Sequence, residues 1–503
     1  MVIQKTMKKI LTNEDILKYI AENEQKQVPH MNELWEYYKG KDVKILNRKT
    51  PDSNNPDNKI VVSYGRKIIN TFTGYAYRPK YITYKANIQK SQEQIEHDEN
   101  EELPNILIDP IEKKYVNELQ SIYNMNIEHI KTNRAGRNTG IFGCAYELLY
   151  IDSENIENTN GLKIVPRFFS VDPREMIVLY DYSPESKIVC AIRYFKTDNA
   201  NTYRVEVYYK YYTDTFTRIR KDESSATWIL INDNMGIPNL FNEVPVAVYY
   251  MGDEIQSIFE NVLTLIDAHD VLFSDSLNEF DRFAFAYLIM KQVNLTNPIE
   301  KKDPIKSNNA LKELKRRRVF EGLSKDAEIS FLTKDIPTAF IEHIGRQLRE
   351  QIHIQSHVPD FTGDKMAGAS GIAIQRLMFD FENLVSSAEA DFDVGLTMRA
   401  NLVTSMLKKL NVVPKDSDFS SMVTINHKRN IPLNTLEFAQ TALTMSSAGF
   451  SRRAIVGIMP EDIISNVEQE LAEEKMEQEA LTGYNNFDVQ PIEEKLPEEE
   501  LIE

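Results

Sequence analysis

The chain has 503 residues, more than one domain usually contains, and its 42% hydrophobic and 10% aromatic content is ordinary for a folded protein. Its 59 Lys and Arg and 76 Asp and Glu give a net charge of −17, which excludes a uniformly basic surface for nucleic-acid binding. Residues 461–503 hold 15 acids and 2 bases, and residues 91–102 hold 6 acids and no base, so the remaining body is nearly neutral.

Hydrophobic periodicity predicts a helical beginning followed by a β region. Helices are expected at Ile10–Glu24, Met31–Tyr38, Ile60–Tyr75 and Pro110–Arg137, with Gly40 at a C-cap position. Runs rich in Val, Ile, Tyr and Phe then predict antiparallel strands. These strands are expected at Gly143–Asp152, Lys163–Val171, Met176–Tyr180, Ile188–Lys196, Thr202–Tyr212, Trp228–Ile231 and Ala247–Met251.

The second half of the chain is predicted to be mainly helical, beginning with a helix over 252–281. One apolar stripe of this helix must be buried against neighbours, and it contains Ile255, Ile258, Val262 and Leu265. The elements expected after it are a strand at Phe283–Val293, a basic helix at Ala310–Arg318, strands at Val319–Gly322 and Glu328–Leu332, a helix at Thr338–His357, a loop at Val358–Gly371, a long helix at Ile372–Leu410, helices at Leu433–Ala448 and Ser451–Gly457, and an acidic helix from Pro460. Gly395 lies inside the long helix, where we expect a kink.

No motif for nucleotide chemistry is present. The spacing of Gly136, Gly140 and Gly143 matches neither a phosphate-binding loop nor a dinucleotide fingerprint, so a helix-to-strand turn is expected there. Cys144 and Cys190 are too few for a disulfide scaffold or a cysteine-rich zinc module. The apolar neighbours of Cys144 predict a buried structural cysteine.

No secretory signal or membrane span is expected. The longest uncharged apolar run, Phe283–Met290, is far shorter than the ~20 residues that cross a bilayer. We therefore expect a soluble protein of a reducing compartment that does not bind membranes.

His353 and His357 are spaced so that one helix face can present both imidazoles to zinc, with Glu350 as a third ligand. The residues between them lack the general-base Glu of a metalloprotease. An exposed helix face is the main interpretation, and a metal-dependent hydrolase is kept as an alternative.

The densest basic cluster lies in the second half of the chain and consists of Lys312, Lys315, Arg316, Arg317 and Arg318. One interpretation is a solvated helix end, where cations are favoured by the helix dipole. The other is a contact surface for nucleic acid or an acidic partner.

Several strings occur in the order typical of one protein family. They are Trp35–Gly40, Ile45–Arg48, Asn58–Asn70, Gly143–Tyr150, Ile164–Pro166, Glu175–Tyr180, Val358–Phe361, Ala369–Ala373 and Pro460–Asp462. Taken together they resemble the portal proteins of tailed bacteriophages, particularly the branch typical of long-tailed phages of Gram-positive hosts. The resemblance extends over nearly the whole chain, and it rests on the ordered set because no single string is diagnostic.

The resemblance implies an α+β, helix-rich portal fold and a closed ring, usually of twelve subunits, at one vertex of a capsid. The implied parts are a wing at 1–251 with its β-rich part at 143–251, stem helices at 252–281 and 336–356, a clip at 282–335, an inner tunnel loop at 357–370, a long helix at 371–411, and a crown at 412–503 with an acidic C-terminal tail. The implied sites are a DNA-tunnel loop with His357, Asp360, Thr362, Lys365 and Met366, partner docking by the basic cluster of the clip, and a stem interface with Ile255, Ile258, Val262 and Leu265.

The implied function is a passive conduit for double-stranded DNA during packaging and ejection, without enzymatic activity, metal or cofactor. Expected partners are further copies of the chain, the terminase large subunit, a head-completion adaptor, and the major capsid and scaffolding proteins. The expected location is the virion, after assembly in the host cytoplasm. Another structural head or neck protein is the second hypothesis.

The long helix is predicted to let DNA slide if one of its faces lines the tunnel, because acids repel phosphate and few bases are present to grip it. Its acids up to Arg399 are Asp380, Glu382, Glu389, Asp391 and Asp393, and its bases are Arg376 and Arg399.

Overall fold

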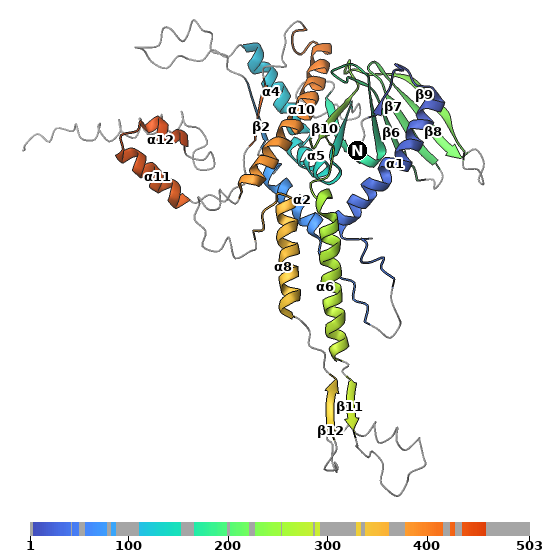
Figure 1. Cartoon of the computed structure of the whole chain (residues 1–503). Coiled ribbons are helices and arrows are strands. Elements are labelled where there is room, and N and C mark those ends of the chain that lie inside the picture. Colours follow the sequence, from blue (N-terminus) through green and yellow to red (C-terminus); the bar gives the residue numbers. More distant parts are fainter. Residues whose placement is uncertain are drawn as a thin grey trace, which may run out of the picture. The chain divides into compact units, whose positions relative to one another are not determined.

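The computed structural model describes residues 4–41, 43–49, 56–77, 82–86, 110–151, 165–198, 202–220, 227–252, 254–284, 287–291, 328–332, 338–361, 378–415, 423–427 and 435–458. These residues form a mixed structure of helices and sheets, divided into the units Met1–Asn430 and Ile431–Glu503 (Figure 1).

Helix α1 (Asn13–Lys39) is continuous, whereas two shorter helices are predicted for this region. Thr12 and Asp15 form a capping box at its start, and Gly40 ends it with φ of 69°, which confirms the predicted C-cap. The helix continues through Pro29. Its first half packs into one hydrophobic core and its second half into another, so tertiary packing holds both sides of a residue that normally breaks helices.

A six-stranded sheet occupies the N-terminal half of the chain. Its order is β1 (Gln4–Lys5), β5 (Met176–Tyr180), β6 (Ile188–Lys196), β7 (Thr202–Tyr208), β8 (Tyr212–Arg220) and β9 (Trp228–Pro238). β1 pairs with β5 in parallel and the other neighbours are antiparallel. The predicted bounds of β5 and β6 are confirmed, whereas β8 is missing from the prediction. Helix α1 covers one face, where Ile16 and Ile20 join Leu179, Ile192 and Val207 in the smaller core.

The larger core joins a three-stranded antiparallel sheet to helices. Its elements are β10 (Val246–Tyr250), β3 (Cys144–Ile151), β4 (Pro166–Val171), α2 (Tyr64–Ala76), α4 (Pro110–Met125), α5 (Glu128–Phe142) and α10 (Phe379–Lys409). The single helix predicted for Pro110–Arg137 is wrong, because the chain breaks between α4 and α5 at Ile127, where φ is 51°.

The glycine-rich stretch of α5 owes its composition to close packing. The predicted turn into a strand is confirmed at Gly143, which ends α5 with φ of 78°. Gly136 and Gly140 instead lie inside the helix. A Cβ on Gly136 would lie 2.2 Å from Cδ2 of Tyr77, so only glycine permits that ring to approach α5.

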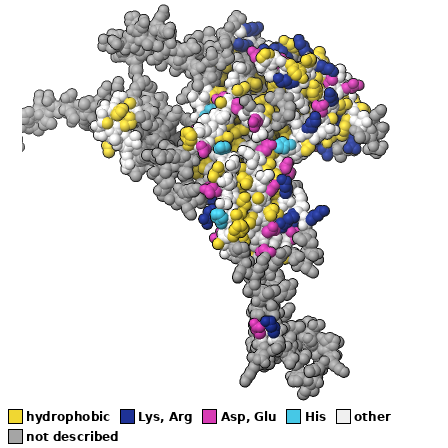
Figure 2. All heavy atoms as spheres, in the orientation of Figure 1, with side chains coloured by type: hydrophobic (Ala, Val, Ile, Leu, Met, Phe, Trp, Pro, Cys, Tyr) yellow, Lys and Arg dark blue, Asp and Glu magenta, His cyan; other side chains and the backbone are white. Residues whose placement is uncertain are grey.

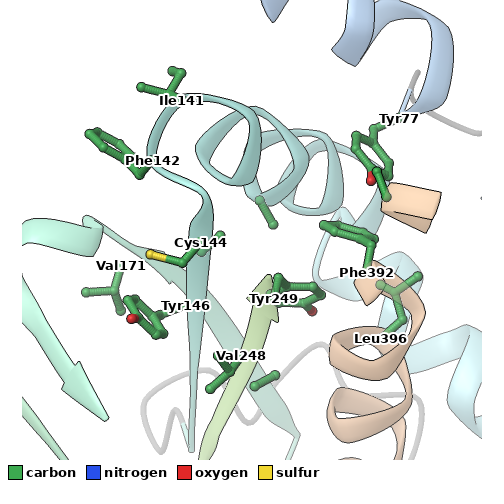
Figure 3. Close-up of a cluster of buried hydrophobic side chains, with 14 of the residues drawn as sticks. Tyr77, Ile141, Phe142, Cys144, Tyr146, Val171, Val248, Tyr249, Phe392 and Leu396 are labelled. Carbon is green, nitrogen blue, oxygen red and sulfur yellow. The ribbon is translucent and has the colours of Figure 1, made fainter. Parts of the chain in front are cut away.

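Helix α10 packs against β10 through aromatic rings. The ring of Phe392 lies between those of Tyr77 and Tyr249, with centroid distances of 4.4 and 4.7 Å (Figure 3). Gly395, where a kink is predicted, lies within one continuous helix and faces Tyr249. Its role is therefore to admit an aromatic ring.

The helix predicted over 252–281 begins later than expected. Residues 254–259 are not helical, and a 3-10 turn (Glu260–Val262) leads into α6 (Leu263–Ala284). Strands β11 (Tyr287–Lys291) and β12 (Glu328–Leu332) follow as an antiparallel pair, and α8 (Thr338–Gln355) comes next.

Two remaining features involve the C-terminal part of the chain. Strand β13 (Val423–His427) pairs with β2 (Ile82–Ala86), a contact that the sequence pattern does not predict. In the second unit, α11 (Thr435–Ser447) and α12 (Arg452–Ile458) pack against each other. The predicted elements at Ala310–Arg318 and Val319–Gly322 and the acidic helix from Pro460 lie outside the described residues.

Candidate functional site

Helices α6 and α8 pack side by side and run in opposite directions (Figure 1). Gly345 of α8 faces Leu272 of α6, and a Cβ on Gly345 would lie 3.7 Å from Cδ2 of Leu272, an ordinary van der Waals distance. β11 follows α6, and β12 precedes α8 along the chain. The helical pair therefore brackets a segment that contains a small antiparallel ladder.

A second face of α6 binds the backbone of residues 56–62. Its acceptors Asp270, Ser274 and Asn278 are spaced by four residues and buried. Side chains at this spacing share one helix face, and alternate N–H groups of an extended segment point to one side, so the two spacings match. Hydrogen bonds of 2.7–2.9 Å reach these side chains from the backbone N–H groups of Val62, Ile60 and Asn58.

A third face of α6 exposes large apolar side chains. Phe273, Leu277 and Phe280 follow each other at helical spacing, and Phe280 is 65% exposed. On α8, Phe340 and Ile354 are also exposed. Figure 2 shows hydrophobic surface along these helices. A single chain leaves this surface in water, which is typical of an interaction site.

The four residues predicted to form the stem interface lie in or against the core of a single chain. Ile255, Ile258 and Val262 precede α6 and are buried in the core of the same chain, with Val262 fully buried. Leu265 is partly buried and packs against the same core. These four residues stabilise the fold of one chain, and the exposed apolar face of α6 begins further along the helix.

Asp360, predicted to belong to a DNA-tunnel loop, is held by cations from two helices. Its Oδ2 accepts hydrogen bonds from Nε and Nη2 of Arg349 on α8 at 2.7 and 2.6 Å. Its Oδ1 lies 3.2 Å from Nζ of Lys67 on α2. The sequence spacing carries no signal for Lys67, because 293 positions separate it from Asp360.

His353 lies beside this ion-pair group and is buried. Burial lowers its pKa below the ordinary value, and the neighbouring Lys67 and Arg349 act in the same direction. A neutral imidazole fits both contacts: Nδ1–H can donate to the carbonyl of Val358 at 2.8 Å, and Nε2 can accept from Nζ of Lys67 at 3.4 Å.

The paired-histidine geometry expected for a zinc site is absent. Helix α8 ends at Gln355, so His357 lies beyond it, exposed and with φ of 55°. His353 and His357 therefore do not share a helix face. In the part of the chain that the structure describes, no group of three or more His, Cys, Asp or Glu side chains could hold a metal ion.

Three acids of the face predicted for α10 make contacts within the chain or are buried, whereas Asp380 is exposed. Tyr75 donates to Glu382 at 2.6 Å, Asp393 lies 2.7 Å from Nε2 of His427, and Glu389 is buried. Arg399 is fully buried, with Nη2 at 2.6 Å from Oε1 of Glu128. These particular contacts therefore stabilise the packing of α10.

Both cysteines are buried, as predicted for Cys144. Burial raises the pKa of each thiol to about 12. Neither thiol is suited to act as a nucleophile at neutral pH.

The remaining predicted site residues lie outside the described residues. They are Thr362, Lys365 and Met366 of the inner loop, Lys312, Lys315, Arg316, Arg317 and Arg318 of the basic cluster, and Arg376. Within the described ranges, no helix has the length and apolar character needed to cross a bilayer.

The model of one protein family, described as "Phage portal protein, SPP1 Gp6-like", matches residues 17–483. Among solved structures, a chain from the neck of an empty GTA particle, computed with C6 symmetry, is similar over 66% of this chain and 79% of that chain. The sequence identity is 12% and the TM-score is 0.37. No curated protein matches this chain.

Proposed function

Because the chain belongs to the SPP1 Gp6-like family of phage portal proteins, we propose that it forms a closed ring through which double-stranded DNA passes during packaging and ejection. The family is structural, and the ring acts as a passive conduit without bond chemistry. Its location is a capsid vertex of the virion, after assembly in the host cytoplasm. We propose twelve subunits.

The observation that carries this proposal is the exposed apolar face of α6. Phe273, Leu277 and Phe280 lie on a helix whose other faces are already occupied by α8 and by residues 56–62. An adjacent copy of the chain can bury this face, and repetition of one such heterologous contact closes a ring when the rotation is right. The stem interface is therefore proposed at these residues.

The proposed parts of the subunit follow the family resemblance. The wing spans 1–251, the stem spans 252–281 and 336–356 and contains most of α6 and all of α8, and the clip spans 282–335 with β11 and β12. The inner tunnel loop spans 357–370, the long helix 371–411 and the crown 412–503. The stem with a small terminal clip is supported by the chain order, in which the antiparallel pair β11 and β12 lies between α6 and α8.

The proposed partners are the terminase large subunit and a head-completion adaptor at the clip, and the major capsid and scaffolding proteins around the ring. A ring would repeat Lys312, Lys315 and Arg316–Arg318 as a positive collar, which attracts acidic protein surfaces or DNA by steering. Replacing Lys312, Lys315 and Arg317 by Glu is expected to leave rings intact and to abolish binding of terminase or adaptor. Normal binding and packaging by this variant would show that the cluster is only solvated surface.

Electron microscopy of the purified full-length protein tests the ring directly. Rings with a central hole are expected in the micrographs. In a separate packaging assay with terminase present, added DNA should be translocated. Particles without a closed ring would favour a different structural component of the head or neck.

A further inference from the structure

The ion-pair group of Asp360, Arg349 and Lys67 lies where the chain leaves α8 and enters the proposed inner loop. Asp360 is 20% exposed, and both of its carboxylate oxygens contact cations of the same chain. Four residues separate Asp360 from Gln355, the last residue of α8, so without these contacts the backbone could leave the helix in several directions.

Neighbouring contacts fix the same short segment at a second point. The ring of His353 bonds to the carbonyl of Val358 at 2.8 Å, and Val358 is buried in the larger core. The ring of Tyr64 on α2 meets the ring of His353 edge-on, with a centroid distance of 6.1 Å. Helix α2 therefore contacts this segment directly through Lys67 and packs against His353 through Tyr64, and α8 contacts the segment through His353 and Arg349.

We propose that Asp360 is an anchor that positions the start of the inner loop, and that Lys67 and Arg349 are its positioning partners. The effect of this anchor on DNA passage rests on the proposed function, because the loop is assigned to the DNA tunnel by that proposal. The inference gives Asp360 a different role from the one expected for a tunnel residue. A carboxylate already engaged by two cations does not present a free negative charge to passing DNA, so its contribution is to set the path of the loop.

The two possible roles of Asp360 predict different effects of removing the charge of Lys67. If Asp360 acts as an anchor, removing either the carboxylate charge or a cation loosens the same segment. If Asp360 instead lines the tunnel and repels phosphate, removing Lys67 should not reproduce the effect of removing Asp360, because Lys67 carries no negative charge that repels phosphate.

The test uses full-length protein carrying Asp360→Asn, Lys67→Met or Arg349→Met. Lys44→Met is the control, because Lys44 forms an ion pair with Asp267 at 2.8 Å, away from this segment, and the side chains of Asp267 and Asp360 are 18% and 20% exposed. The measurement is amide hydrogen exchange in a peptide covering 355–361, without DNA. We expect exchange to rise roughly three- to tenfold in all three variants and to stay at the wild-type rate in Lys44→Met.

Wild-type exchange in Asp360→Asn would overturn the proposal, as would a rise in Asp360→Asn that neither cation variant reproduces. Thermal unfolding of each variant separates local loosening from a general loss of stability. DNA translocation is then compared in rings that assemble normally. The exchange result stands even when no translocation is seen, so failure of the anchor and failure of the proposed conduit are distinguishable.

Discussion

The ring of Tyr249 occupies the space that a side chain at Gly395 would need. A Cβ built on Gly395 would lie 2.3 Å from Cδ1 of Tyr249, well inside van der Waals contact. The long helix α10 and strand β10 approach each other closely because this one position on the helix lacks a side chain.

Gly395→Ala is therefore expected to destabilise the protein by about 1–3 kcal/mol, although alanine favours helices, because the ring and helix must move apart. Chemical denaturation measures the change. Gly74→Ala is the control, because Gly74 lies in α2 and the added Cβ would meet no atom within 4 Å beyond its own stretch of helix, so a small stabilisation is expected there. Equal effects of the two substitutions would contradict the packing role of Gly395.

Arg399→Met tests the buried charges beneath α10. Arg399 is fully buried and bonds to Glu128 at 2.6 Å and to Glu147 at 3.2 Å, so its loss leaves two carboxylates without their cation. A loss of about 3–5 kcal/mol is expected in chemical denaturation. Arg204→Met, which removes an exposed partner of Glu206, should cost less than about 1 kcal/mol. A similarly small loss in Arg399→Met would show that the buried ion pairs of Arg399 contribute little to the free energy of unfolding.

Phe280→Asp tests the proposed stem interface without disturbing the fold. The side chain of Phe280 is 65% exposed in one chain, so the variant should fold normally but fail to form rings in electron microscopy. Met7→Asp, at a side chain that is 87% exposed and outside α6, should form rings of normal size. Normal rings from Phe280→Asp would place the subunit contact elsewhere.

Val262→Asp is expected to behave differently from Phe280→Asp. Val262 is fully buried in the larger core, so a carboxylate there should lower the stability of the chain itself and cause aggregation. Thermal unfolding of the soluble fraction, compared with Phe280→Asp, measures this difference. A Val262→Asp chain with wild-type stability would be inconsistent with the burial of this residue.

His353 makes stability depend on pH near its ordinary pKa. Its pKa is lowered in the folded chain, chiefly by burial, so below about pH 6.5 the unfolded chain binds more protons than the folded chain. The free energy of unfolding should therefore fall as the pH drops from about 7 to about 5.5, by up to about 1 kcal/mol from this group. His353→Asn, which cannot titrate, should lose less stability over the same range. Parallel pH profiles for the two proteins would exclude this contribution.

The sequence by itself determined those strands and helix ends that depend on residues adjacent along the chain. Runs rich in Val, Ile, Tyr and Phe predicted β5 and β6 with their observed bounds, and Gly40 was predicted as the cap that ends α1. The ordered strings also pointed to the portal family, which the family match over residues 17–483 confirms. Periodicity and capping are local properties, so they can be read without knowing what packs against each element.

Only the tertiary structure decided which residues meet across long separations. Pro29 lies within a continuous helix because the two halves of α1 pack into two separate cores. Helix α6 begins only at Leu263, and the residues before it pack into the larger core. The contact between Lys67 and Asp360 joins residues 293 positions apart, and the pairing of α10 with Tyr249 explains Gly395. These outcomes depend on packing and ion pairs between distant segments, which local propensity does not encode.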